Sequence, residues 1–204
     1  MRKAAIVISV SLGACGGTDA GGADAPADQG ATHKRVFVTS ATYSGDLATA
    51  SGTAFDTPNA GVTGANKLCQ TAATAGLLGG NWIAILQQPN GGLDALSDVG
   101  PWHRLDGMLA FNNLAQLKTT PSVAVNVDEL SNSQSGAASR CVWSGLQAGG
   151  APLPGCALST YGIWTFGNSA QNGVVGDLDA TDSTWIYNGD TNCNGPCRLY
   201  CLEQ

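Results

Sequence analysis

The cysteines constrain this chain more than any other residue type. A short apolar run from Ala4 to Leu12 follows the positive charges of Arg2 and Lys3. It is far shorter than the ~20 residues that a membrane span needs, and its form is typical of a secretory signal. Exported proteins fold in oxidising compartments, so an even number of cysteines after the signal predicts disulfides, although their connectivity stays open. The six candidates are Cys69, Cys141, Cys156, Cys193, Cys197 and Cys201.

The end of the apolar run indicates a lipid anchor. Leu12-Gly13-Ala14-Cys15 resembles the lipobox of bacterial lipoproteins. The resemblance implies that residues 1–14 are a cleaved signal peptide and that Cys15 is lipidated, so that acyl chains hold the protein to a membrane. Gly16 follows Cys15 where an aspartate would favour inner-membrane retention, so the resemblance favours the outer membrane of the cell envelope. The alternative is an ordinary cleaved signal with an incidental cysteine.

Composition separates a tether from a domain. Residues 16–31 are rich in Gly, Ala and Asp, which bury too little apolar surface to fold, so residues 15–33 are expected to form a flexible lipidated tether. Residues 34–204 have the length of one domain. Loss of Arg2 and Lys3 from nine basic residues leaves seven against fifteen acidic ones. This acidic balance argues against nucleic acid as a partner.

Local patterns predict an α+β domain with few helices, short strands and long loops. β-Branched and aromatic residues predict strands over 34–40 and 81–86, and Asp106-Gly107 between two apolar runs predicts a hairpin. Apolar residues at 3–4 spacing predict a helix from Thr63 to Ala75, capped by Thr63 and ended by Gly76. The remaining expectations are a loop over 48–59, a second helix over 112–117, and strands over 122–129, 141–146, 162–167, 183–188 and 198–204.

Four segments together carry a resemblance to a known family: 36–40 with 43–47, 64–70, 142–145 and 199–204. They resemble bacterial exported lipoproteins whose C-terminal domain of unknown function is similar to the endostatin module of basement-membrane collagens. That module has a C-type-lectin-like fold, so the resemblance implies this fold for residues 34–204, with the first and last strands paired. It also implies the disulfides Cys69–Cys201 and Cys156–Cys193, and Cys141 and Cys197 could then pair with each other. The competing pattern joins the neighbours Cys141–Cys156 and Cys193–Cys197.

Catalytic or metal-binding uses of cysteine and histidine find little support. Cys193, Cys197 and Cys201 are spaced C-x3-C-x3-C, which matches no common zinc or iron–sulfur pattern. A hydrolytic triad needs a histidine, and the domain offers only His103, with His33 at its edge. Six paired cysteines would leave no thiolate nucleophile. The sequence therefore favours a protein that is not an enzyme, and a hydrolase using His103 is the weakest hypothesis.

One acidic stretch suggests a calcium site. Asp177, Asp179 and Asp182 are followed by Asn188 and Asp190, and calcium prefers such oxygen ligands on loops. The spacing is not that of an EF-hand. Asp and Asn in loops more often hydrogen-bond nearby backbone groups to form turns. Calcium is thus the one cofactor that the sequence suggests, and turn chemistry is the competing interpretation.

Ligand contacts are sought among the aromatic residues near loops. Trp164 and Trp185 could stack on sugar rings, with Asn188 and Asp190 supplying polar contacts, although large aromatic residues are usually buried. The resulting hypothesis is a membrane-anchored binding or adhesion module for a glycan or protein partner. The alternative is a structural envelope lipoprotein with no specific ligand.

Overall fold

The computed structural model describes residues 33–89, 91–158 and 162–204. The predicted signal peptide, Cys15 and almost all of the predicted tether lie outside the described residues. Within the described part of the chain, no helix combines the length and the apolar character that crossing a bilayer requires.

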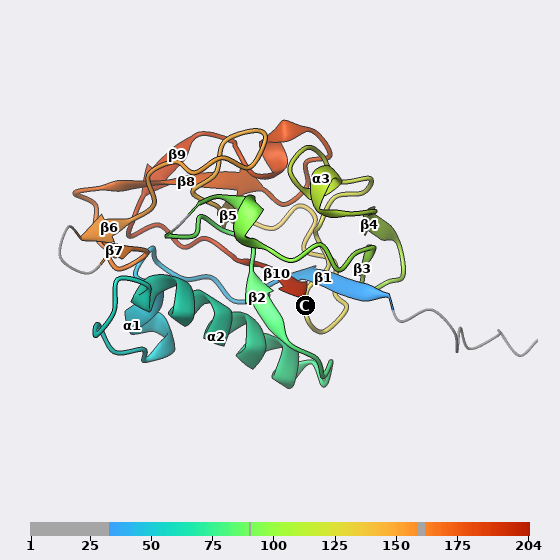
Figure 1. Ribbon diagram of the computed structural model, residues 1–204, viewed down its shortest axis with the longest axis horizontal. Helices are drawn as coiled ribbons and strands as arrows, with labels where there is room; N and C mark the ends of the chain where they lie inside the picture. The colour runs from blue at the N-terminus through green and yellow to red at the C-terminus, as the bar shows by residue number, and fades with distance from the viewer. Residues whose placement is uncertain (1–32, 90, 159–161) are drawn as a thin grey trace, which may run out of the picture. The chain divides into compact units, whose positions relative to one another are not determined.

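The main sheet has five strands, and β1 (Lys34–Val38) is the middle one (Figure 1). It pairs antiparallel with β10 (Tyr200–Glu203) and parallel with β3 (Trp102–Arg104). The expected pairing of the first and last strands is therefore confirmed. The outer strands are β2 (Trp82–Ala84) beside β10 and β4 (Leu109–Phe111) beside β3, and the predicted hairpin at Asp106-Gly107 joins β3 to β4.

Side chains of β1 alternate between two hydrophobic cores. Phe37 belongs to the core that includes Leu68 and Ala72 of α2 (Ala60–Ala75). Val36 and Val38 point to the opposite face and belong to a second core that is rich in aromatic side chains. In Figure 1, α2 accordingly lies on one side of the sheet, and the later part of the chain covers the other side.

Helix α2 begins three residues earlier than predicted, and Asn59 rather than Thr63 stands at its cap position. Gly76 ends the helix as expected, because its N–H donates to the carbonyl of Ala72. Asn66 and Gln70 accept hydrogen bonds from the backbone N–H groups of Ala84 and Trp82. The helix therefore covers the free edge of β2, which would otherwise expose unpaired backbone donors.

A second sheet has the order β5 (Cys141–Trp143), β8 (Asn172–Asp177), β9 (Asp190–Asn192), all antiparallel. The sequence does not predict strand β8, because Gly173 and Gly176 interrupt the run of β-branched residues in it. A Cβ at Gly176 would lie 1.9 Å from the carbonyl oxygen of Trp185, so only glycine allows this close approach. The remaining elements are β6 (Ala157–Leu158), β7 (Gly162–Ile163), α1 (Leu47–Ser51), α3 (Leu114–Leu117), and the 3-10 helices η1 (Leu93–Ala95) and η2 (Ser183–Trp185).

Three disulfides join elements that are distant in the sequence. The pairs are Cys69–Cys201, Cys141–Cys197 and Cys156–Cys193. Cys69–Cys201 and Cys156–Cys193 are the pairs that the family resemblance implies, and Cys141–Cys197 is the remaining pair that it left possible. The competing pattern of neighbouring pairs is not the one found. Few helices, short and mainly antiparallel strands and three disulfides make this an α+β domain.

Three local predictions are wrong, each for a packing reason. Residues 122–129 form no sheet strand, because they lie in a loop that buries Val125 and Val127 and makes only the isolated bridge Val127–Ser133. Residues 48–59, predicted as a loop, include most of α1, whose N-cap Asp46 accepts a hydrogen bond from the N–H of Thr49. Residues 183–188, predicted as a strand, begin with η2, which turns Trp185 into the second core.

Candidate functional site

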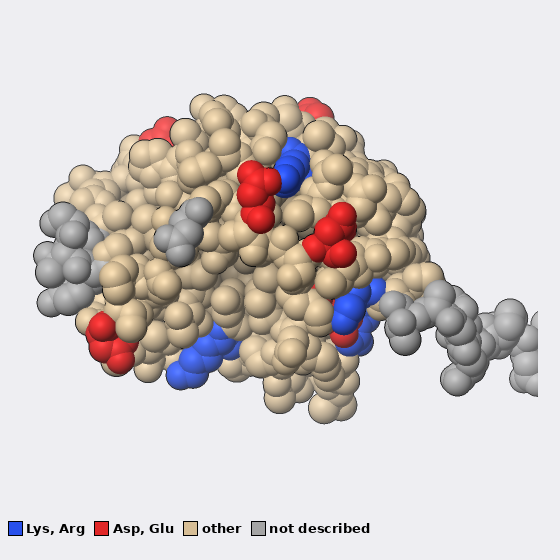
Figure 2. Space-filling view, viewed as in Figure 1, with Lys and Arg blue, Asp and Glu red and all other residues tan. Residues whose placement is uncertain are grey.

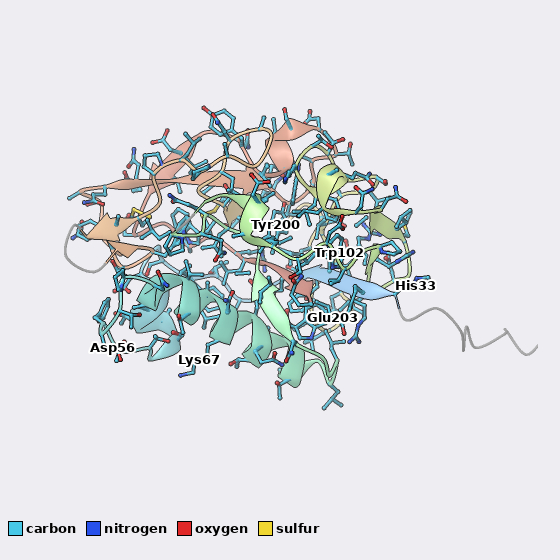
Figure 3. All side chains as sticks on the ribbon, viewed as in Figure 1. His33, Asp56, Lys67, Trp102, Tyr200 and Glu203 are labelled. Atoms are coloured by element: carbon cyan, nitrogen blue, oxygen red, sulfur yellow. A yellow bond between two sulfur atoms is a disulfide. The ribbon has the colours of Figure 1, made fainter. Side chains whose placement is uncertain are left out.

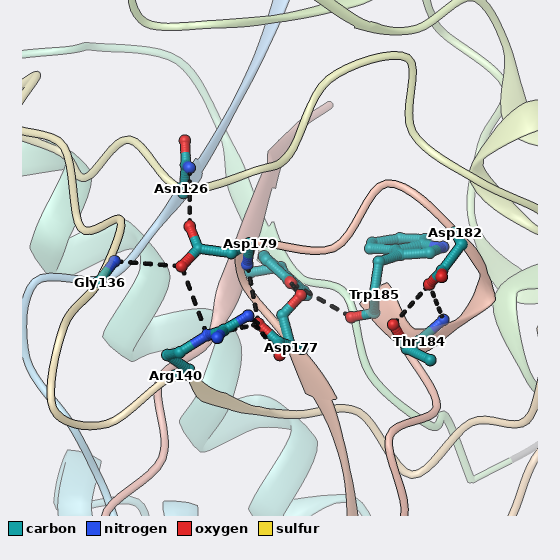
Figure 4. A network of polar contacts seen from close by, with 9 residues as sticks. Asn126, Gly136, Arg140, Asp177, Asp179, Asp182, Thr184 and Trp185 are labelled. Carbon is teal, nitrogen blue, oxygen red and sulfur yellow. Dashed lines mark hydrogen bonds and ion pairs between the residues drawn. The ribbon is translucent and has the colours of Figure 1, made fainter.

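Two of the three candidate calcium ligands form ion pairs with an arginine (Figure 4). Arg140 Nη2 lies 2.7 Å from Asp177 Oδ2, and Arg140 Nε lies 3.4 Å from Asp179 Oδ2. Asp179 also accepts hydrogen bonds of 2.9 Å from Asn126 and 3.1 Å from the N–H of Gly136. The guanidinium offsets one of the two negative charges, and its own positive charge disfavours a metal cation beside it.

These contacts also set the protonation of Asp179. Partial burial alone would raise its pKa, but hydrogen bonds from Asn126, Gly136 and Ser135, together with the charge of Arg140, outweigh burial and lower the pKa. The carboxylate is thus held in its charged form as a structural acceptor that joins the turn after β8 to the long segment between α3 and β5.

The third candidate, Asp182, caps η2. Its Oδ1 accepts hydrogen bonds from the hydroxyl and the N–H of Thr184, and these bonds lower the pKa of Asp182. Asp177 likewise accepts from the N–H two residues ahead, at Asp179. Such bonds are the turn chemistry that competed with calcium in the sequence. The described residues contain no group of three or more His, Cys, Asp or Glu placed to hold a metal ion.

The tryptophans are core residues rather than a sugar-stacking surface. Trp164 and Trp185 are both 0% exposed. The indole N–H of Trp164 donates to the carbonyl of Gln87, and that of Trp185 donates to the carbonyl of Thr119. Trp102, labelled in Figure 3, is equally buried and donates to the carbonyl of Glu203. The prediction that Trp164 and Trp185 contact a ligand directly is therefore wrong, because the ring of each is buried and its indole N–H donates a hydrogen bond inside the domain.

A shallow hollow of about 280 Å³ lies between the β8–β9 hairpin and a nearby loop. Tyr187 stands in it with 45% of its surface exposed, whereas the large aromatic side chains around it in the sequence are buried. Its lining combines apolar, aromatic and polar groups from segments that are distant in the sequence. The lining residues are Leu153, Pro154, Asn172, Val174, Tyr187, Gly189 and Asp190.

Backbone contacts fix the polar side of this hollow. Val174 pairs with Asp190 across β8 and β9, and the N–H of Val175 donates to the carbonyl of Gly189. Gly189 has a φ of +87°, which lets the chain turn sharply into β9. The side-chain amide of Asn172 donates a 2.5 Å hydrogen bond to Asp190 Oδ2. The bond holds the Asp190 carboxylate in one orientation at the wall of the hollow.

This arrangement suits a small polar ring. The tyrosine ring offers an apolar face with a hydroxyl at its tip, and the Asn172–Asp190 pair offers carboxylate and amide oxygens that accept hydrogen bonds from hydroxyl groups. Charged side chains are few and separated on the face of the domain shown in Figure 2. The hollow is wide enough for one sugar ring or one side chain of a partner.

Sequence reasoning found part of this site. Asp190 lines the hollow as a candidate contact, whereas Asn188 is exposed on the same turn but does not line it. Tyr187, Asn172 and the Leu153–Pro154 segment were missed. The only sequence signal for Tyr187 is that an aromatic residue directly precedes the turn residues Asn188-Gly189.

Two other features are poorer sites. His103 lies in β3, and its ring centroid is 4.3 Å from that of His33 at the domain edge. A second hollow, of about 430 Å³, is lined only by residues of α2 between Lys67 and Ala75, so no groups from different elements converge there. No known family model matches the chain, and no curated protein is detectably similar to it.

Proposed function

We propose that the chain is a lipid-anchored envelope protein whose domain has a C-type-lectin-like fold and binds a glycan without converting it chemically. The binding site is the Tyr187 hollow. The exposed tyrosine beside a fixed carboxylate–amide pair is the observation that carries this proposal.

The arrangement of the chain supports the finer fold assignment. The first and last strands pair, α2 is cross-linked to the last strand by Cys69–Cys201, and a long stretch with little regular structure separates β4 from β8. The strand pairing and the Cys69–Cys201 disulfide are features that the resemblance to the endostatin-like lipoproteins implies. The lipid anchor is supported by the sequence of residues 12–15.

In the proposed complex, a sugar ring stacks on Tyr187 and its hydroxyl groups contact Asp190, so substitutions at these two residues test the proposal directly. The full-length chain, solubilised in detergent, is applied to a glycan array and to an array of envelope peptides, and the affinity of any ligand is measured by calorimetry. Loss of an aromatic contact of about 1.4 kcal/mol corresponds to a tenfold weaker affinity. We therefore expect Tyr187→Ala and Asp190→Ala each to weaken glycan binding about tenfold or more.

Phe55→Ala is the matched control, because Phe55 is also an exposed aromatic side chain, at 39%, and does not line the hollow. This variant should bind as the wild type does. Peptide binding that depends on Tyr187 would replace the glycan by a protein partner. No binding on either array would favour a structural envelope lipoprotein, and binding that survives both substitutions would move the site elsewhere.

A further inference from the structure

Two adjoining loops each display a leucine to solvent. Leu77, just after α2, is 92% exposed, and Leu130 is 56% exposed. The loops touch, because a Cβ on Gly76 would lie 2.2 Å from the carbonyl oxygen of Glu129. We call Leu77 and Leu130 the leucine tip. Leu77 has a φ of +56°, a conformation that leucine seldom adopts, so the fold tolerates local strain to present this side chain.

The charged residues next to the leucine tip in the sequence are buried, because Asp128 and Glu129, which directly precede Leu130, are only 1% and 7% exposed. Residues 68–82 and 130–139 contain no Asp, Glu, Lys or Arg. Small and hydroxyl-bearing residues surround the two leucines instead, as in the Thr-Ala-Gly-Leu-Leu-Gly-Gly segment that begins at Thr74. An apolar tip whose neighbouring charges are already buried can enter an apolar phase without the large cost of desolvating an exposed ion. A protein partner chosen by charge would find nothing to pair with here.

The start of the domain lies at the same end of the sheet as the leucine tip. Gln204 donates its N–H to the carbonyl of Asn81, and Lys34 donates from its ammonium group to the carbonyl of Gln204. Neighbouring strands are ~4.8 Å apart, so the first strand starts about 10 Å from Asn81. Only three residues separate Leu77 from Asn81, which keeps the leucine within ~14 Å of that end of the sheet.

The length of chain before the domain limits how far a lipidated Cys15 can be. Eighteen residues lie between Cys15 and Lys34. Even fully extended they span at most ~65 Å. A bilayer holding Cys15 is therefore always within reach of the domain, and this raises its effective concentration so that a contact too weak to form from solution can form.

The leucine tip and the ligand hollow lie on opposite sides of the domain. In Figure 1 the end of α2 is at the bottom of the view, whereas β8 and β9 are at the top. Lys67, labelled on the lower side in Figure 3, is the basic residue near the middle of α2. If the lower side faces a bilayer, the Tyr187 hollow faces away from it.

We propose that the leucine tip docks on the membrane that carries the lipid anchor, and that this contact orients the domain with its ligand hollow outward. The proposal rests on the proposed lipid anchor. Leu77 and Leu130 enter the interfacial region of the bilayer, and the loops that carry them lie against the head groups.

The experiment places a fluorescent reporter at the leucine tip. The full-length lipidated chain with Leu77→Trp is reconstituted in phosphatidylethanolamine–phosphatidylglycerol vesicles with or without lipids brominated on their acyl chains, which quench tryptophan on contact. The native tryptophans that matter most as background, such as Trp164 and Trp185, are buried in the domain and supply a constant signal. We expect brominated lipid to remove at least half of the added fluorescence of Leu77→Trp and of a second variant, Leu130→Trp.

Asn188→Trp is the matched control, because it places the same reporter at an exposed position on the turn before β9, on the side of the domain opposite the tip. Its fluorescence should lose less than a tenth on the same vesicles. Flotation of the vesicles reports the anchor separately, with Cys15→Ala as the variant that should not float.

Each outcome decides one of the two proposals. Wild-type chain that fails to float refutes the anchor and the docking that depends on it. Chain that floats while the reporters at 77 and 130 stay unquenched refutes the docking alone. Equal quenching at position 188 refutes the orientation, and protection of position 77 from acrylamide without quenching by brominated lipid shows that protein, not lipid, covers the tip.

Discussion

Replacing Cys69 and Cys201 together by alanine removes the disulfide that joins α2 to the last strand. The cross-link stabilises the fold chiefly by restricting the unfolded chain, and its effect grows with the loop that it closes. The two residues are 132 apart in the sequence. With Cys141–Cys197 intact, however, a shorter covalent path runs through that bond and contains about 76 residues. The chain-entropy relation then predicts a loss of ~4.5 kcal/mol in the free energy of unfolding.

The double substitution of Cys156 and Cys193 is the matched comparison. These two cysteines are 37 apart, and with Cys141–Cys197 intact their shortest covalent path contains about 19 residues. The same relation predicts a loss of ~3 kcal/mol. All four side chains are 0% exposed, so the packing lost on replacing cysteine by alanine is similar in the two variants. The difference between them therefore measures the loop effect.

The assay is urea unfolding of both variants and the wild type without reductant, followed by far-UV circular dichroism. Peptide mapping of the unreduced protein first establishes that the remaining pairs are intact. We expect the Cys69/Cys201 variant to be the less stable of the two by ~1–1.5 kcal/mol. The reasoning is refuted if the Cys156/Cys193 variant is equally or less stable, or if mapping finds Cys69 bonded to any cysteine other than Cys201.

Two further predictions concern stability. A hydrogen bond from Arg104 lowers the pKa of Asp106, and hydrogen bonds from Thr184 lower that of Asp182. As pH falls, these two carboxylates become protonated in the unfolded chain before they do in the folded protein. The stability that they contribute is therefore present above their unfolded pKa of ~3.9 and is lost as pH falls through their lower folded pKa values. Urea midpoints that stay constant from pH 5 to pH 2.5 would contradict this. The Tyr200 hydroxyl donates to the carbonyls of Asp177 and Trp185, so Tyr200→Phe should cost ~1–2 kcal/mol in urea unfolding, whereas Tyr187→Phe should cost almost nothing.

Local patterns predicted the elements in which buried residues recur at the period of a strand or of a helix. The β1 segment alternates between two cores, and α2 places one apolar stripe on the sheet, so the sequence shows both directly. The valines of 122–129 alternate in the same way but are buried by a loop that crosses the second core. A period of two therefore indicates alternate burial here without indicating a ladder of hydrogen bonds.

The candidate site was less predictable, because exposure depends on contacts between distant segments. Trp185 and Tyr187 are aromatic residues two positions apart, which would face the same way on a strand. The 3-10 helix η2 breaks that period, so Trp185 is 0% exposed while Tyr187 is 45% exposed. The different exposure of Trp185 and Tyr187 follows from the cap that Asp182 provides to η2 and from the close packing of Gly176 against the carbonyl of Trp185. Neither contact is visible in the order of residues alone.

The loops that form the hollow are fixed by covalent and hydrogen bonds rather than by a large sheet. Cys156 follows the Leu153–Pro154 wall by two residues, and Cys193 follows Asp190 by three, so one disulfide joins the two segments that face each other across the hollow. The N–H of Cys193 also donates to the carbonyl of Gln171 at the start of β8. A ligand that enters between these segments therefore orders little new backbone, and more of its contact energy remains as affinity. This is why a shallow hollow with few polar groups is a credible binding site in a domain with so few charges.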